Sequence, residues 1–181
     1  MNVTAKMIKK AEVDLQNEQR KQALMVYPAM FCVLWEDYNW RSVRIMRRFI
    51  AAVDAMKEGV KNGTSVLETL EEETGIEMAL DGEKSYHEFA YLSADTKIKP
   101  INNIQYVYML KQEKKWIPSL LIAGVCIILH RQDKWGFDRL SNFVTKVNIL
   151  RNLLGEDQQQ YSNYMFECTG HRPEEMWKEY N

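Results

Sequence analysis

The amino-acid sequence predicts an all-α protein, in which an irregular linker joins two pseudo-repeated helical units. Glycine and proline are scarce, with 8 and 4 in 181 residues, so the elements are expected to be long and the turns few. Apolar residues recur at three-, four- and seven-residue steps along most of the chain, which is the pattern of amphipathic helices. Helix start and stop signals also follow the same order in both halves.

Four helices are expected in the first half: an amphipathic one, a short buried one, a long amphipathic one and a short capped one. Pro28 fits the first turn of the buried helix, where a missing amide hydrogen is tolerated. Ser65 and Glu68 form a capping box at the start of the fourth helix, and Gly63 and Gly75 end the third and fourth helices. The expected ranges are 4–24, 28–35, 40–62 and 64–75.

The second half repeats this order of elements. Its helices are expected over residues 104–116, 118–130, 135–154 and 158–168, with a short helical tail over 173–180. Residues 76–98 are the least regular part, and a β-hairpin around Asp81-Gly82 is the main alternative to a wholly helical chain. The predicted organisation is one unit over 1–80, a linker over 81–96 and a second unit over 97–181, within one shared globular domain.

A shift of 95 residues aligns the two halves without a gap. It places Trp40 on Trp135, Arg44 on Arg139 and Gly75 on Gly170, each at an equivalent start, face or stop of a helix. We therefore expect an internal duplication, with each indole filling the corner where the long helix begins. If the helices of each unit pack antiparallel, the shift also predicts two ion pairs, Arg44–Glu72 and Arg139–Glu167.

Composition and motifs exclude several classes of function. The net charge of −1 gives no overall case for a nucleic-acid or membrane partner, and the apolar run Ile117–Leu129 is too short to span a bilayer. Three cysteines without a close pair, after a polar and basic start, indicate an intracellular, reduced protein. No nucleophile or phosphate-loop motif is present, so we expect neither an enzyme nor a cofactor. Only Cys168-x-x-His171 has metal-ligand spacing, and because zinc needs more ligands than these two, no metal is expected.

Four arginines within eight residues form the clearest charged feature. On a helix Arg41, Arg44 and Arg48 share one face, and Arg47 borders it. Guanidiniums in a row suit phosphates or the carboxylates of a partner. A solvated face with ion pairs to the neighbouring glutamate-rich helix is the alternative.

The acidic helix that follows is the second candidate surface, through Glu68, Glu71 and Glu72 with Glu73 and Glu77 nearby. These side chains could mimic nucleic acid in a basic groove, or simply be solvated. A third candidate partner surface lies beside the linker, where tyrosines gather at 86, 91, 106 and 108.

The segment around Trp135 reads ILHRQDKWGFDRLSNFVTKV over residues 128–147. It contains a Leu-His pair, a glycine–aromatic break and an Arg-Leu step, and a Glu-x-x-Gly helix stop follows. This pattern resembles a helical motif of uncharacterised phage and prophage proteins of Firmicutes. In the first half Trp35 and Arg41 replace His130 and Gly136, so the motif is eroded there. The chain as a whole also resembles the small type II anti-CRISPR proteins of such elements.

The resemblance implies a non-catalytic phage or mobile-element protein that binds and inhibits a host defence nuclease. The implied partner is a type II CRISPR RNA-guided (Cas) nuclease or its guide-RNA complex. The residues expected to bind it are Arg41, Arg44, Arg47, Arg48, Glu68, Glu71 and Glu72. The alternative is a DNA-binding accessory or regulatory protein that contacts phosphates through the helices at 40–62 and 64–75, and a homodimer remains open.

Overall fold

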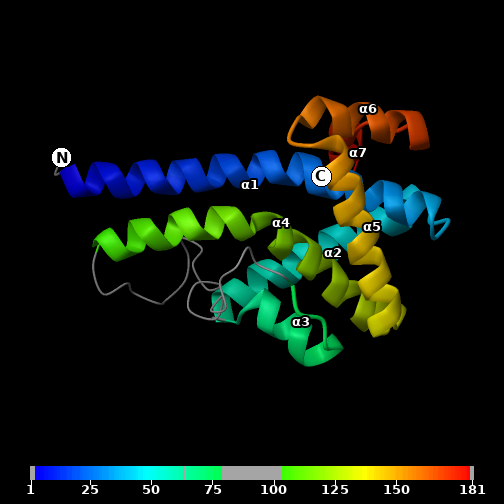
Figure 1. The fold of residues 1–181 in the computed structure, drawn as a ribbon, viewed down its shortest axis with the longest axis horizontal. Helices are drawn as coiled ribbons and strands as arrows, with labels where there is room; N and C mark the ends of the chain where they lie inside the picture. Colours follow the sequence, from blue (N-terminus) through cyan, green and yellow to red (C-terminus); the bar gives the residue numbers. More distant parts are fainter. Residues whose placement is uncertain (1–2, 63, 79–102, 180–181) are drawn as a thin grey trace.

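The computed structural model describes residues 3–62, 64–78 and 103–179. These residues form helices only, which confirms the all-α prediction for the described part of the chain (Figure 1). The linker 81–96 and the possible hairpin at Asp81-Gly82 lie outside the described residues. None of the described helices is long and apolar enough to cross a membrane. The helices are α1 (Val3–Glu36), α2 (Ser42–Asn62), α3 (Val66–Thr74), α4 (Asn103–Asp133), α5 (Phe137–Leu154), α6 (Gln158–Thr169) and α7 (Pro173–Glu179).

Pro28 and Pro118 lie inside long helices and do not begin new ones. The expected helices at 4–24 and 28–35 are one continuous helix, α1, and those at 104–116 and 118–130 are one helix, α4. A proline within a helix costs about 3 kcal/mol, because it removes a hydrogen bond and crowds the preceding turn. Around Pro28 the side chains of Val26, Met30 and Leu34 are each 0% exposed. Burial of this continuous apolar surface outweighs the cost of the proline.

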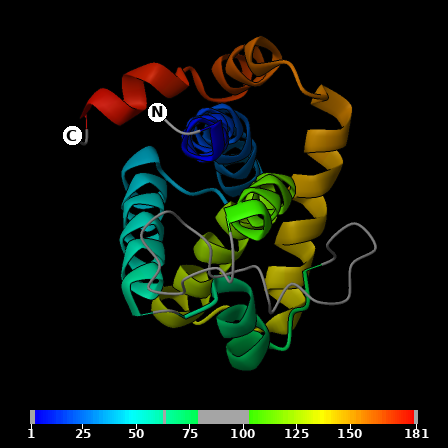
Figure 2. The ribbon, with the colours of Figure 1, turned by 90° about the vertical axis from the view of Figure 1, so that its left-hand side faces the viewer.

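The long helices α1 and α4 lie side by side at the centre of the molecule and run in the same direction (Figure 1). Figure 2 looks along both helices from their amino-terminal ends. In this view α2 and α5 flank the central pair on opposite sides, and α3 and α6 lie below and above it. The four shorter helices thus surround the central pair on all sides in this view.

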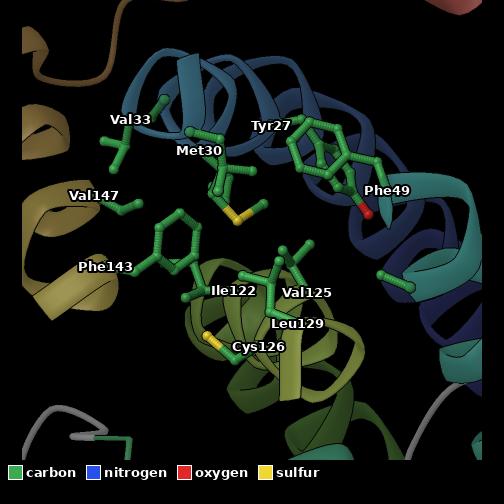
Figure 3. Close-up of a cluster of buried hydrophobic side chains, with 14 of the residues drawn as sticks. Tyr27, Met30, Val33, Phe49, Ile122, Val125, Cys126, Leu129, Phe143 and Val147 are labelled. Carbon is green, nitrogen blue, oxygen red and sulfur yellow. The ribbon is translucent and has the colours of Figure 1, made fainter. Parts of the chain in front are cut away.

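The shorter helices of each half pack mainly on the long helix of the other half. Helices α2 and α3 pack on α4, whereas α5 and α6 pack on α1, and α1 contacts its own neighbour α2 less than it contacts α5. One large core results (Figure 3), to which α1, α2, α4 and α5 all contribute. Its side chains include Met30, Val33, Phe49, Ile122, Val125, Leu129, Phe143 and Val147.

The two corners that follow the long helices have the same geometry. The amide of Trp40 donates to the carbonyl of Leu34 at 3.1 Å, and the amide of Trp135 donates to that of Leu129 at 3.3 Å. Each corner turns through a non-glycine residue in the left-handed region, Asn39 with φ 54° and the lysine at 134 with φ 59°. The indoles that follow these residues are buried, at 5% and 2% exposure, as the sequence predicted.

The helix stops predicted at Gly75 and Gly170 are present, whereas the one predicted at Gly63 lies outside the described residues. Gly75 and Gly170 take left-handed conformations, with φ 74° and 75°, and cap α3 and α6. Each follows a threonine whose hydroxyl donates to a carbonyl four residues earlier, at 2.6 Å for Thr74 and 2.7 Å for Thr169. At the other end of α3 the Ser65 hydroxyl accepts a hydrogen bond from the Glu68 amide at 3.2 Å, as expected of an N-cap.

Candidate functional site

The basic face of α2 is directed at the carboxyl-terminal end of α4. Arg48 binds the Asp133 carboxylate with two nitrogens, at 2.6 and 3.0 Å, and Arg44 binds the same group at 2.7 Å. The Asp133 side chain is only 3% exposed. Burial alone would raise the pKa of this carboxyl, but the hydrogen bonds from Arg48 and Arg44 outweigh burial and lower it. Two of the four predicted arginines therefore join the halves of the molecule.

The predicted ion pairs Arg44–Glu72 and Arg139–Glu167 are wrong. Arg44 binds Asp133 instead, and its guanidinium carbon lies 3.7 Å from the centroid of the Trp40 ring. Arg139 lies over Trp135 in the same way, at 4.2 Å. The prediction assumed that the helices of each unit pack on one another. Instead α2 packs on α4, and each arginine contacts groups near the corners.

The other two predicted arginines are exposed: Arg41 lies immediately before α2, and Arg47 lies on it. Within the described part of the chain neither guanidinium forms an ion pair. Between them Val43 is 46% exposed. These three side chains are the part of the predicted basic face that is accessible to a partner, and we call them the α2 surface.

The acidic residues of α3 lie on the outside of the molecule. Glu71 and Glu72 are exposed and Glu68 is half-buried. Glu73 accepts two hydrogen bonds from the Arg131 guanidinium of α4, one of them at 3.0 Å between Nε and Oε2. Sequence reasoning missed this pair, because Arg131 falls in a stretch that was interpreted as a polar break after the helix.

The residues with metal-ligand spacing do not converge. The Cys168 thiol lies beside Glu36 and Tyr164, and burial together with the hydrogen bond to Glu36 raises its pKa. His171 packs edge-on against the Trp35 ring, with 5.8 Å between ring centroids. Among the described residues no three His, Cys, Asp or Glu side chains gather in a way that could hold a metal ion.

Two clefts open between the helices of the described part. One of about 500 Å³ lies between residues 76–78, α4 and α5, and Trp116, Asn148 and Arg151 contribute to its lining. The other, of about 240 Å³, lies between α2, α3 and α4. There Gly124 permits a close approach of α4 to α2, because a Cβ atom would lie 2.7 Å from the Met56 sulfur.

The first turns of α1 and α4 form a surface that sequence reasoning missed. We call residues 3–24 of α1 and 103–116 of α4 the arm. A small apolar cluster holds the two segments together, formed by Ala11, Leu15, Val107, Leu110 and Ile117. Of the tyrosines expected near a partner surface, Tyr106 donates to Glu12 at 3.3 Å, and Tyr108 is 50% exposed. Those at 86 and 91 lie outside the described residues.

The arm differs in charge from the rest of the chain. It carries eight basic and four acidic residues, whereas the remainder carries sixteen basic and twenty-one acidic residues. One of the four acidic residues, Glu113, is 5% exposed, and burial raises its pKa to about 8. The total charge of −1 conceals this separation. A charge count for each predicted helix would have revealed it.

Comparison with known proteins finds no family model, no curated protein and no solved structure that matches this chain. Function must therefore be inferred from the chain's own residues. The accessible charged features are the α2 surface, the acidic face of α3 and the arm.

Proposed function

We propose that the protein is a non-catalytic binding protein of a phage or another mobile element, which inhibits a host defence nuclease in the host cytoplasm. The proposed partner is a type II CRISPR RNA-guided nuclease or its guide-RNA complex. The observation that supports this proposal is the separation of charge: acidic side chains on α3, basic side chains on α2 and the arm. A nucleoprotein offers both basic protein grooves and acidic phosphates, so a ligand with separate faces of each sign is complementary to it.

The acidic face of α3 is the part proposed to enter a basic groove of the nuclease. Glu71 and Glu72 are exposed on a helix that Ser65 caps at one end and Gly75 at the other. Both caps hold the short helix in place before a partner binds, which lowers the entropy lost on binding. The two exposed carboxylates would meet the lysines and arginines that line a nucleic-acid channel.

The α2 surface is the second proposed contact. Arg41 and Arg47 are accessible, while Arg44 and Arg48 fix α2 against Asp133. Arginine beside an exposed apolar side chain such as Val43 is typical of protein interfaces. The alternative function, phosphate contacts by α2 and α3, would depend on Arg41 and Arg47, because the other two guanidiniums are already bound.

Inhibition of target cleavage by a panel of purified RNA-guided nucleases tests the proposal. The variant Glu71→Gln with Glu72→Gln is expected to weaken inhibition about tenfold, the loss typical of one strong charged contact. The control is Glu174→Gln with Glu175→Gln, an adjacent exposed pair on α7 with the same change in charge, and it is expected to inhibit like the wild type. If the wild-type protein neither slows nor co-purifies with any nuclease of the panel, the proposal is wrong.

We also propose that the two halves arose by duplication of one helical unit. The corner hydrogen bonds, the left-handed residues and the glycine caps recur at a spacing of 95 residues. The stacking of Arg44 on Trp40 recurs as that of Arg139 on Trp135. Such a history accounts for the reciprocal packing of the halves, because two copies of one unit can pack on each other in the same way.

A further inference from the structure

The arm presents a basic face that no described helix covers. Figure 1 shows the first turns of α1 and α4 extending away from α5, α6 and α7. The apolar cluster between the two segments is separate from the main core, so the arm is held by its own packing. That packing uses the inner sides of both helices, and no described helix packs on their outer sides.

The outer side of α1 within the arm is basic without interruption by acidic residues. Since an α-helix has about 3.6 residues per turn, Lys6, Lys10 and Arg20 project opposite the buried Leu15. Lys9 borders the same face. All four side chains are exposed, and none forms an ion pair within the described part of the chain. The acidic residues of this segment, Glu12, Asp14 and Glu18, are half-buried, and Glu12 accepts a hydrogen bond from Tyr106 of α4.

The outer side of α4 within the arm carries two large exposed side chains followed by two lysines. Ile104 is 80% exposed and Tyr108 is 50% exposed. Lys111 and Lys115 are exposed and follow on the same face, at steps of three and four residues. A lysine row beside an exposed aromatic ring is suited to phosphates and unstacked bases.

We propose that the arm binds the phosphate backbone of a nucleic acid. From Lys6 to Arg20 the basic face of α1 extends over about 21 Å, at about 1.5 Å per residue, which is long enough to contact several successive phosphates. Lysine suits this partner because it contacts phosphate as a point charge and carries no base preference. The binding is therefore expected to be independent of sequence and to weaken steeply with salt.

The geometry favours a nucleic acid over a lipid surface. A helix that lies on a membrane inserts an apolar face beneath the headgroups. In the arm the apolar sides that carry Ala11, Leu15 and Leu110 are buried against each other. The large apolar side chains that stay exposed in the arm are interspersed with charged residues, which contact phosphate, and they leave less apolar surface to insert than a buried helix face would; they are Met7, Val13, Leu24, Ile104 and Tyr108.

Binding is best measured by fluorescence anisotropy with a labelled duplex DNA and a single-stranded RNA of equal length, at about 50 and 200 mM salt. The variant Lys6→Glu with Lys10→Glu is compared with Lys57→Glu with Lys178→Glu, which changes the same charge at exposed positions on α2 and α7. The arm variant is expected to bind about tenfold more weakly, with a salt slope lower by about 2. The control is expected to bind within about twofold of the wild type.

Three results would overturn the inference. They are the absence of binding to either nucleic acid at the lower salt, an equal loss in both variants, and binding to phosphatidylserine vesicles alone. Stronger binding to the RNA or to the DNA would identify which nucleic acid supplies the phosphates. Nucleic-acid binding by the arm goes beyond the proposed inhibition of a nuclease. The anisotropy measurement contains no nuclease, so it can fail while the inhibition assay succeeds, and the reverse.

Discussion

The two interfaces between the halves occupy equivalent places but use different chemistry. Where α2 packs on α4, Arg48 binds the Asp133 carboxylate. At the positions shifted by 95 residues, where α5 packs on α1, Phe143 meets Tyr38 edge to face, with 6.5 Å between ring centroids. One interface is held by a partly buried ion pair and the other by aromatic rings, although the backbone corners beside them are alike.

A second pair of side-chain contacts related by the 95-residue shift also differs in chemistry. Glu73 of α3 binds Arg131 of α4, whereas the corresponding residues of α6 and α1 are Cys168 and Glu36. If two first halves paired with each other, Glu73 would face Glu36, and two like charges would meet. The two halves are therefore complementary to one another, because each carries a side chain that pairs with one in the other half.

Truncation of the corner tryptophans is expected to have the largest effect. Trp135 packs against Tyr38, Trp40 and Phe143, at centroid distances of 4.6, 5.5 and 5.9 Å. Trp135→Ala should lower the free energy of unfolding by about 4 kcal/mol, and Trp40→Ala by about 3 kcal/mol, because Trp40 has fewer aromatic neighbours. Urea denaturation measures both values. Equal losses of unfolding free energy in the two variants would contradict the expectation that Trp135 contributes more to stability than Trp40.

Removal of the shared carboxylate should have the next largest effect. Asp133→Asn leaves Arg48 and Arg44 without their anion, and we expect a loss of about 2–3 kcal/mol. The matched change at the other interface, Tyr38→Phe, removes only a hydroxyl near Asn142 and no charge. It should alter stability by less than about 0.5 kcal/mol. A comparable loss in the two variants would contradict the contrast between the interfaces.

The effect of Asp133 should also depend on pH. Its pKa in the folded protein lies below the ordinary value of 3.8. Stability from the ion pair is therefore fully present above the unfolded pKa and is lost as pH falls through the lower, folded pKa. The difference between wild type and Asp133→Asn should be constant near neutral pH and shrink below pH 3.8. A difference that persists in strong acid would show that the charge is not its source.

Glu113 in the arm should have a smaller effect of opposite sign. Its folded pKa of about 8 lies above the ordinary value of 4.5, so the folded protein loses stability as pH rises between these values. Glu113→Gln should therefore stabilise the protein by about 1–2 kcal/mol at pH 8, and by little at pH 4. Thermal melting at both values measures this. The counterpart Glu18 accepts a hydrogen bond from Gln22 at 2.8 Å, and Glu18→Gln should bring no such gain.

The smallest effect is expected at the surface ion pair. The side chains of Arg131 and Glu73 are 48% and 30% exposed, so solvent screens their attraction. Glu73→Gln should lower the free energy of unfolding by about 0.5 kcal/mol, and by less in about 1 M salt. Cys168→Ser, at the equivalent position of α6, should show no change with salt. Salt-dependent loss in both would argue against different chemistry at the two sites.

Helix ends were the part of the fold that local sequence signals could predict. Ser65, Gly75 and Gly170 carry their capping chemistry within a few residues, and both tryptophans lie at the corners where their spacing placed them. The continuity of α1 through Pro28 was not predictable in this way. It depends on how much apolar surface the neighbouring helices bury, and that is a property of the assembled core.

For a related reason, sequence alone could not predict which helix packs against each apolar face. An amphipathic pattern specifies which side of a helix is buried but not which helix covers it, so Arg44 was assigned to Glu72 and not to Asp133. The same limit applies to the candidate site. The sequence marked four arginines as candidate contacts, and only the packing of α2 on α4 separates the bound Arg48 from the accessible Arg41 and Arg47.

Reciprocal packing also bears on how the chain is made. While the ribosome is still synthesising residues before 103, α2 and α3 have emerged but α4, the helix that covers them, does not yet exist. Their apolar sides remain exposed, or bound to chaperones, until the second long helix leaves the exit tunnel. A nascent chain that stalls at this stage is therefore expected to be a substrate for proteases, and not a smaller working protein.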